Sequence, residues 1–275
     1  MRIDSHQHFW KYNPERDGWI TEEMKIIRRD FMPDELKPLL DENNIDGCVA
    51  VQADQSEAET DFLLGLAKEH PWIKGVVGWV DLLADNLDQR LDHYQKYEVF
   101  KGVRHILQAE PDGFISNPRF IRGVTRLSKR SLTYDILTHE KQLLEVLTFI
   151  NKLPKMKLVI DHISKPDIKN RSFKLWSAHM KELSTYNHVC IKLSGTITEA
   201  NWSSWKTTDI KPYIDFCLEN FSADRLMFGS DWPVSLLAGS YDRVVSVFEE
   251  CIQGISSQDY EQLMGKTAVQ FYNVK

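Results

Sequence analysis

The sequence predicts an α/β fold, a single (β/α)8 TIM barrel that spans residues 1–275 as one domain. Short apolar runs of strand length alternate with segments of helical periodicity, which is typical of βαβ units and a parallel sheet. Eight such units can be read, the number that a closed barrel requires. The length of 275 residues also suits one barrel, which takes about 250 residues.

Each strand is expected where one of the short apolar runs recurs. The active site of such a barrel lies at the C-terminal ends of its strands, so the residue that ends each run matters most for function. The expected strands cover residues 2–5, 47–53, 75–82, 100–106, 132–137, 157–162, 189–194 and 225–230.

Helices are expected between these strands. Start signals support two of them, because Pro33 and Asp34 fit a first turn, and Ser56 with Glu59 three residues later resembles a capping box. A final helix over 257–272 is expected to pack outside the barrel. The other expected helices cover residues 33–43, 57–68, 87–97, 118–129, 141–152, 173–184, 210–220 and 241–253.

The segment 9–29, after the first strand, has no clear periodicity. Long ordered loops in compact domains are often lids or binding loops. Its aromatic residues Trp10, Tyr12 and Trp19 could therefore cover a site at the mouth of the barrel.

Composition and charge favour a small-molecule partner. Hydrophobic residues make up 42% and charged residues 27%, close to the averages for a soluble globular protein. The net charge of -6 gives no electrostatic footprint for nucleic acid, which needs clustered Lys and Arg. No stretch is long and apolar enough to span a membrane. The sequence is compatible with a homodimer but does not determine the oligomeric state.

The cysteines and the first residues bear on the compartment. Cys48, Cys190, Cys217 and Cys251 lie far apart, without the close spacing of metal or redox motifs, so reduced and buried thiols are expected. The chain begins directly with a strand, so no signal peptide is expected before the fold. We therefore expect a cytoplasmic protein.

Ionisable residues end four of the expected strands. His6 and His8 are two apart, which places both imidazoles on the same side of the first strand. His162 ends the sixth run, and Asp231 follows the eighth as a natural base or ligand. Arg104 near the end of the fourth could polarise a carbonyl or hold a carboxylate. The alternatives are a structural histidine pair and, for Arg104, a salt bridge within the barrel.

Six short motifs in order resemble the amidohydrolase superfamily, specifically its amidohydrolase-related branch of sugar-lactone hydrolases, which includes L-fuconolactonase and L-rhamnonolactonase. The resemblance covers nearly the whole chain. The motifs are DSHQHFW at 4–10, VQA at 51–53, KGVRH at 101–105, DHISKP at 161–166, KLSG at 192–195 and FGSDWP at 228–233.

The resemblance implies a distorted barrel of the metallo-dependent-hydrolase type that opens a lactone ester to a hydroxy acid. Asp231 would activate water, while Arg104, His162 or a metal polarises the carbonyl. Gln52, Trp79, Arg104, His105 and Gln108 could line a polar sugar pocket, although each could equally be a packed or capping group. Lys192 could reach the site, although an ion pair is its more ordinary role.

The resemblance also bears on whether the protein binds a metal ion and how many. No lysine that could be carboxylated to bridge two metals falls at a plausible strand end, so two metals are not expected. His6, His8, His162 and Asp231 could hold one divalent metal, preferably Zn²⁺. Activity without any metal is the alternative that the sequence leaves open.

Two other functions compete with the lactonase. One is a Zn-dependent decarboxylase of the same superfamily, which would use the same ligands. The other is a non-catalytic sugar-binding barrel. Resemblance alone favours L-fucono- or L-rhamnonolactone as the substrate, while ring size and stereochemistry are not specified.

Overall fold

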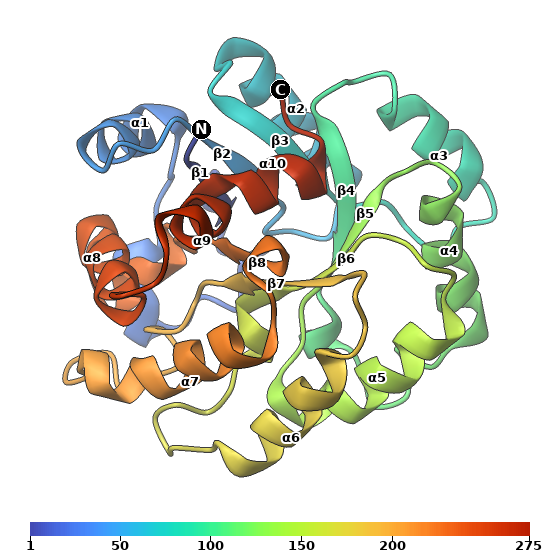
Figure 1. Cartoon of the computed structure of the whole chain (residues 1–275). Helices are drawn as coiled ribbons and strands as arrows, with labels where there is room; N and C mark the ends of the chain where they lie inside the picture. Colours follow the sequence, from blue (N-terminus) through green and yellow to red (C-terminus); the bar gives the residue numbers. More distant parts are fainter.

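The computed structural model describes residues 1–275 and confirms the predicted barrel, with eight strands in chain order around its centre (Figure 1). All neighbouring strand pairs are parallel, as consecutive βαβ units require. The strands are β1 (Ile3–Gln7), β2 (Gly47–Val51), β3 (Ile73–Gly78), β4 (Phe100–His105), β5 (Thr133–Ile136), β6 (Leu158–Ile160), β7 (Val189–Leu193) and β8 (Leu226–Phe228).

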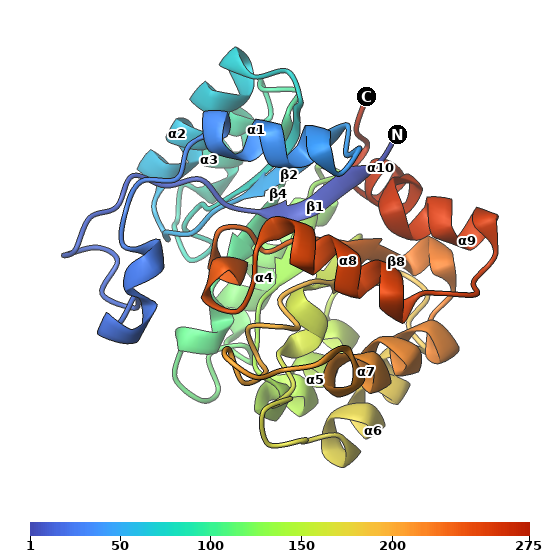
Figure 2. The ribbon, with the colours of Figure 1, turned by 90° about the vertical axis from the view of Figure 1, so that its left-hand side faces the viewer.

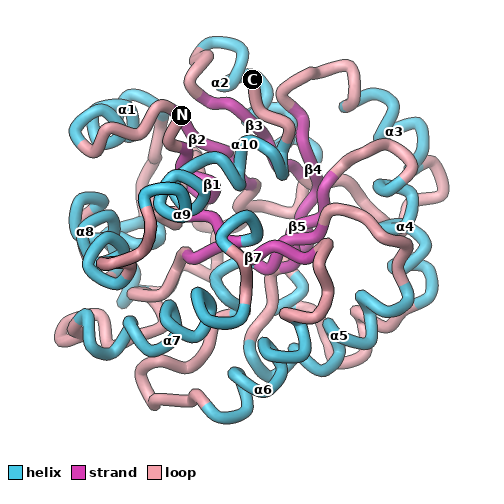
Figure 3. The backbone as a smooth tube through the Cα atoms, in the orientation of Figure 1, coloured by secondary structure: helices cyan, strands magenta, loops and turns pink.

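Helices α1 to α8 follow the strands one by one and form a ring around them (Figure 3). Each buries one stripe, as in α5, where Leu143, Val146, Leu147 and Ile150 follow helical spacing. None of the helices combines the length and apolarity needed to cross a membrane. The helices are α1 (Pro33–Glu42), α2 (Glu57–Glu69), α3 (Leu87–Tyr94), α4 (Pro118–Ser128), α5 (Leu143–Lys152), α6 (Lys174–Leu183), α7 (Thr207–Asn220) and α8 (Tyr241–Cys251).

The barrel closes between β1 and the segment that follows β8. The backbone N–H of Asp231 donates to the carbonyl of His6 at 2.8 Å, and that of His8 donates to the carbonyl of Trp232 at 2.7 Å. The Trp232–Pro233 peptide bond at this seam is cis. Closure therefore sets two histidines and an aspartate, far apart in the sequence, side by side.

A β-bulge in β1 turns His6 toward the barrel interior. Ile3 already packs inside the barrel, and a regular strand would turn the residue three positions later to the outside. The register against β2 shifts between Asp4 and Gln7, and this shift restores the inward direction at His6. The other seven strands all end one to four residues earlier than predicted, and after two of them, β6 at Ile160 and β8 at Phe228, the backbone turns toward the site.

The C-terminal segment lies at the barrel end where the N-terminus lies, opposite the loop after β1 (Figure 2). The single helix predicted over 257–272 is wrong in one respect, because α9 (Ser257–Glu261) and α10 (Thr267–Tyr272) are separated by a π-helical turn. Gly265 leaves helical geometry there, and a Cβ on it would lie 2.1 Å from the Met1 carbonyl oxygen. Close packing on the start of β1 therefore bends the helix.

Two apolar clusters form the core. The larger one lies between the strands and the surrounding helices. The smaller one fills the barrel, where side chains of the strands meet Ala268, Phe271, Tyr272 and Val274 of the C-terminal segment. The C-terminal segment thus seals the end of the barrel away from the site.

Candidate active site

The C-terminal ends of the strands open into a cavity of about 230 Å³. Its volume is just under the roughly 300–1,000 Å³ of sites for drug-sized ligands, so it suits a small molecule. Side chains that follow β1, β4, β6 and β8 line it, which is where α/β barrels carry their active sites. Its charged and polar lining residues are His8, Arg104, Gln108, His162, Lys165 and Asp231.

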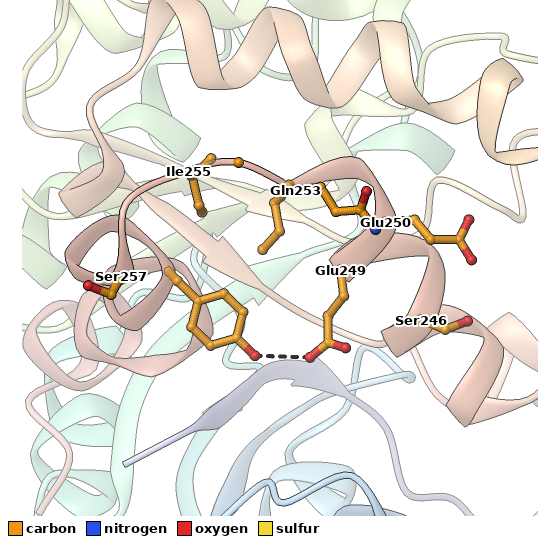
Figure 4. Close-up of a pocket in the computed structure, with 9 residues that line it drawn as sticks. Ser246, Glu249, Glu250, Gln253, Ile255 and Ser257 are labelled. Atoms are coloured by element: carbon orange, nitrogen blue, oxygen red, sulfur yellow. Dashed lines mark hydrogen bonds between the residues drawn. The ribbon is translucent and has the colours of Figure 1, made fainter.

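A larger hollow of about 710 Å³ lies on the outside of the molecule, between the end of α8 and α9 (Figure 4). Its half-buried polar groups, Glu249 and Tyr260, already have partners. Glu249 accepts a hydrogen bond from the Tyr260 hydroxyl at 2.9 Å and another from Arg2 at 3.2 Å. This hollow lacks the convergent, unpaired polar groups of a binding site, so we place the candidate site at the barrel mouth.

The four residues predicted as the metal and catalytic cluster meet at one carboxylate oxygen. Oδ1 of Asp231 lies 3.5 Å from Nε2 of His8, 3.7 Å from Nε2 of His162 and 4.0 Å from Nε2 of His6. His6 of β1 and His8, directly after it, also face each other, with 3.2 Å between their Nε2 atoms. All four side chains are almost completely buried.

Local contacts aim these imidazoles. Nδ1 of His8 lies 2.7 Å from the carbonyl oxygen of Val51, which fixes the proton on Nδ1 and leaves the Nε2 lone pair free. Nδ1 of His162 lies 2.9 Å from the hydroxyl of Ser194. Gly195 allows this ring to approach, because a Cβ there would lie 2.7 Å from its Nδ1.

Burial and neighbouring charges set the protonation states of the cluster. Burial lowers the pKa of His6, His8 and His162, so these imidazoles are neutral at pH 7. Burial opposes ionisation of Asp231, but His162 and His8 outweigh it and hold the pKa of this carboxyl below its ordinary value. The site therefore presents an ionised carboxylate among neutral rings, a state suited to accepting a proton.

A buried layer of charges supports the cluster from inside the barrel. Nζ of Lys192 lies 2.6 Å from Oδ2 of Asp135, 3.0 Å from Oδ1 of Asp161 and 3.1 Å from Nδ1 of His6. Nη1 of Arg104 lies 3.3 Å from the other oxygen of Asp161. Two cations thus compensate two carboxylates. Lys192 fulfils both predicted alternatives, since it forms ion pairs and also contacts His6.

The five predicted pocket residues occupy different places. Gln108 and Arg104 line the cavity, whereas Gln52, Trp79 and His105 do not. Gln52 lies behind Arg104, because its carbonyl oxygen accepts from Nη2 of Arg104 and its amide donates to the Arg104 carbonyl at 3.2 Å. Trp79 donates to Nδ1 of His105 at 3.3 Å, and Nε2 of His105 lies 2.7 Å from Glu110.

Part of the loop after β1 covers the cavity. Trp10 and Trp19 line it, while Tyr12 does not. The two indole rings meet edge to face, with 6.1 Å between their centroids. Trp10 is buried and its Nε1 donates to the Arg29 carbonyl at 2.9 Å, whereas Trp19 is 43% exposed. Trp10 thus forms a fixed wall and Trp19 an exposed edge of the cavity.

Sequence reasoning assigned no role to Lys165, Asp161 or Asp135. Lys165 lines the cavity, and the two aspartates form the buried charged layer. Both Lys165 and Asp161 stand in the DHISKP motif, so their positions beside His162 were visible. The direction of Lys165 was not, because it depends on a left-handed turn after β6.

The donor set fits one divalent metal. Nε2 of His6, Nε2 of His8 and a carboxylate oxygen of Asp231 all lie within 4.8 Å of one another. Histidine nitrogen and carboxylate oxygen are ordinary Zn²⁺ ligands at about 2.0–2.2 Å, and tetrahedral ligands at that range stand about 3.4 Å apart. The His8 contact with Val51 adds the outer-shell hydrogen bond that usually orients a metal-binding histidine.

The parallel barrel and the histidine–carboxylate cluster at its strand ends define a barrel protein with a metal-capable site at its mouth. The amidohydrolase family model matches residues 3–274, and the chain belongs to this family. The resemblance inferred from the motifs is thereby confirmed.

Two relatives and one crystal structure are similar over the full length of the chain. An L-fucono-1,5-lactonase of Burkholderia multivorans is 40% identical and aligns with 99% of this chain and 96% of its own. An L-fucono-1,5-lactonase of Burkholderia ambifaria is 33% identical over 100% of this chain and 96% of its own. The crystal structure of an amidohydrolase from Burkholderia multivorans with bound zinc is 39% identical, with a TM-score of 0.97 and complete coverage of both chains.

Proposed function

We propose that this protein hydrolyses a sugar lactone, with a deoxy-sugar lactone such as L-fucono-1,5-lactone as the preferred substrate. The observation that carries the proposal is the convergence of three imidazoles on the carboxylate of Asp231, which faces a small cavity. The full-length similarity to two L-fucono-1,5-lactonases supports the choice of substrate class.

In the proposed reaction Asp231 takes a proton from water, and the resulting hydroxide attacks the lactone carbonyl carbon. Arg104 or His162 polarises the carbonyl from the cavity wall. Collapse of the tetrahedral intermediate breaks the bond to the ring oxygen, which takes the proton back from Asp231. The product is a hydroxy acid that ionises at neutral pH. A general base in such a step contributes about 10²–10⁴-fold.

Substrate contacts follow from the unpaired polar atoms near the cavity. Oε1 of Gln108, which lines the cavity, is buried without a hydrogen-bond partner, so it would accept from a sugar hydroxyl. Gln52 would act by fixing the direction of Arg104. Trp79 and His105, predicted as direct pocket contacts, would act from behind the wall as a hydrogen-bonded pair.

His6, His8, His162 and Asp231 would hold a single divalent metal, with Zn²⁺ preferred. A bound metal would supply Lewis-acid polarisation of the carbonyl. The zinc in the similar amidohydrolase supports this assignment. The residues that bind the sugar and accept the proton are the same with or without metal.

The test is a pH-indicator assay on purified protein with a panel of sugar lactones. Lactonase activity releases acid from at least one lactone of the panel. Release of CO₂ from an aromatic or unsaturated acid, without lactone hydrolysis, would instead support a decarboxylase. Binding of sugar lactones without acid release would support a non-catalytic barrel. Either of those results refutes the proposal.

A further inference from the structure

Lys165 reaches the cavity from an unusual turn. Four successive non-glycine residues after β6 have positive φ, namely His162 at 52°, Ile163 at 48°, Ser164 at 60° and Lys165 at 45°. This region is sparsely populated, and for a β-branched residue such as Ile163 it is an outlier. Each such residue costs on the order of 1–3 kcal/mol, and strain of this kind concentrates at functional sites.

The surrounding structure holds this turn in place. The indole Nε1 of Trp176 donates to the carbonyl of Ile163 at 2.7 Å. The hydroxyl of Ser164 lies 2.8 Å from the hydroxyl of Thr138. The backbone N–H of Lys165 donates to the carbonyl of His162 at 2.7 Å. These contacts place an imidazole and an ammonium on the same cavity wall.

The ammonium of Lys165 has free hydrogen-bonding capacity. Its Nζ makes no hydrogen bond in the structure, and its ion-pair partner, Oε1 of Glu199, is 3.8 Å away. Its side chain is 19% exposed and lines the cavity together with Asp231 and His162. An ammonium offers three N–H donors, so Lys165 can donate to a ligand without breaking a contact.

By contrast, both terminal nitrogens of the Arg104 guanidinium already have partners. Its Nη1 contacts Asp161 at 3.3 Å, and its Nη2 donates to the carbonyl of Gln52. Its Nε is buried. New charge on a substrate oxygen is stabilised best by donors that are already aimed and not otherwise used. Lys165 meets this condition better than Arg104 does.

We infer that Lys165 is a catalytic residue whose ammonium binds the lactone carbonyl oxygen and stabilises the oxyanion that forms when water attacks. The inference rests on the proposed lactonase activity. When Asp231 removes the proton from water, the carbonyl π electrons move to the oxygen beside Lys165. They return when the ring C–O bond breaks. Lys165 keeps its proton throughout, and Glu199 balances its charge between turnovers.

Replacement of the ammonium measures its contribution. Loss of one oxyanion donor lowers kcat by about 10²–10³-fold, so Lys165→Met is expected to lose this much kcat with a smaller change in KM. Lys165→Arg is expected to recover part of it. Lys169→Met is the matched control, because Lys169 is an exposed lysine of the same loop that does not line the cavity.

Chemical rescue separates catalysis from folding. Lys165→Cys introduces the sole cavity-facing thiol, because all four native cysteines are buried. Alkylation with 2-bromoethylamine restores an ammonium at nearly the length of lysine, and should return activity at least tenfold. Alkylation with iodoacetamide adds similar bulk without charge and should not.

The outcomes separate the two proposals. An active wild type with an inactive Lys165→Met and rescue by aminoethylation supports the role of Lys165. An active wild type with an equally active Lys165→Met, or equal rescue by both reagents, overturns this role alone. A tenfold rise in KM at unchanged kcat also overturns it, because Lys165 would then bind the substrate equally well in the ground state and in the transition state. A wild type inactive on every lactone overturns the proposed function itself.

Discussion

The hydroxyl of Tyr272, in the last helix of the chain, donates a 2.6 Å hydrogen bond to Oδ2 of Asp135 in the middle of the barrel. The same oxygen accepts from Lys192 at 2.6 Å, and Nζ of Lys192 lies 3.1 Å from Nδ1 of His6. The C-terminal helix therefore reaches the floor of the candidate site through three side chains. The contribution of this series of contacts to stability can be tested by changing Tyr272.

Tyr272→Phe removes one donor from a buried carboxylate and leaves the ring in place. Hydrogen bonds to charged groups contribute about 1.5–3 kcal/mol, so the free energy of unfolding is expected to fall by this amount. Denaturant titration measures it.

Tyr134→Phe is the matched control. Tyr134 precedes Asp135 on β5, and its buried hydroxyl has no hydrogen-bond partner. Its removal should therefore leave stability unchanged or raise it. Equal losses in the two variants would contradict a specific role for the Tyr272 hydroxyl.

The fold could be predicted because the signals for it are local. Each strand–helix unit carries its own periodicity, and the rule that the site lies at the strand ends then brings His6, His162 and Asp231 together. The bend at Gly265 was not predicted, because it arises from packing against Met1, at the other end of the chain. The β-bulge in β1 was not predicted either, because it depends on the register against β2.

The parts of the site that sequence missed depend on contacts between distant elements. The direction of Lys165 follows from four left-handed residues, and no single residue type there signals such a turn. Asp135 and Tyr272 are partners across the whole length of the barrel. Gln52 and His105 were predicted to line the pocket from their strand ends, but side-chain hydrogen bonds direct them elsewhere.

Asp231→Asn keeps the shape of the side chain and removes its basicity. Turnover is expected to fall by about 10²–10⁴-fold, because the amide cannot take the proton from water. The pKa of the Asp231 carboxyl lies below its ordinary value, so wild-type activity should be lost only when the pH falls into the acid range. Steady-state assays and thermal unfolding are measured together. Retention of most activity in a folded variant would show that Asp231 is not the base.

Removal of one imidazole should weaken metal binding. His8→Ala is expected to lose most bound zinc after dialysis against metal-free buffer, since it deletes a donor of the His6, His8 and Asp231 group. Metal content per chain is measured by elemental analysis. His93→Ala, an exposed histidine in α3, is the control and should retain the wild-type content. Equal zinc in both variants would place the metal elsewhere.

The exposed indole at the edge of the cavity should contribute to substrate binding. Trp19 is 43% exposed and lines the cavity beside Trp10. Trp19→Ala is expected to raise KM for the lactone severalfold with little change in kcat, because a ring at the edge of the cavity would contact the sugar and not the reacting carbonyl. Steady-state kinetics of the variant and the wild type measure both KM and kcat. A fall in kcat without a change in KM would instead indicate a part in closing the site.

Burial of Glu59 makes the stability of the fold depend on pH. Burial raises the pKa of this carboxyl from 4.5 to about 7, although it accepts a hydrogen bond from the Ala53 N–H at 3.1 Å. The protonated form is thus favoured in the folded chain. The contribution of Glu59 to stability is fully present below pH 4.5 and is lost as the pH rises through about 7.

Glu59→Gln is neutral at every pH and keeps a carbonyl oxygen for Ala53. Its free energy of unfolding relative to wild type should therefore rise between pH 4.5 and 7, by up to about 3 kcal/mol at about 1.4 kcal/mol per pKa unit. Urea titrations of both proteins at pH 4.5, 6 and 8 measure this difference. A difference that stays constant over this range would mean that Glu59 is ionised in the folded protein at both ends of it.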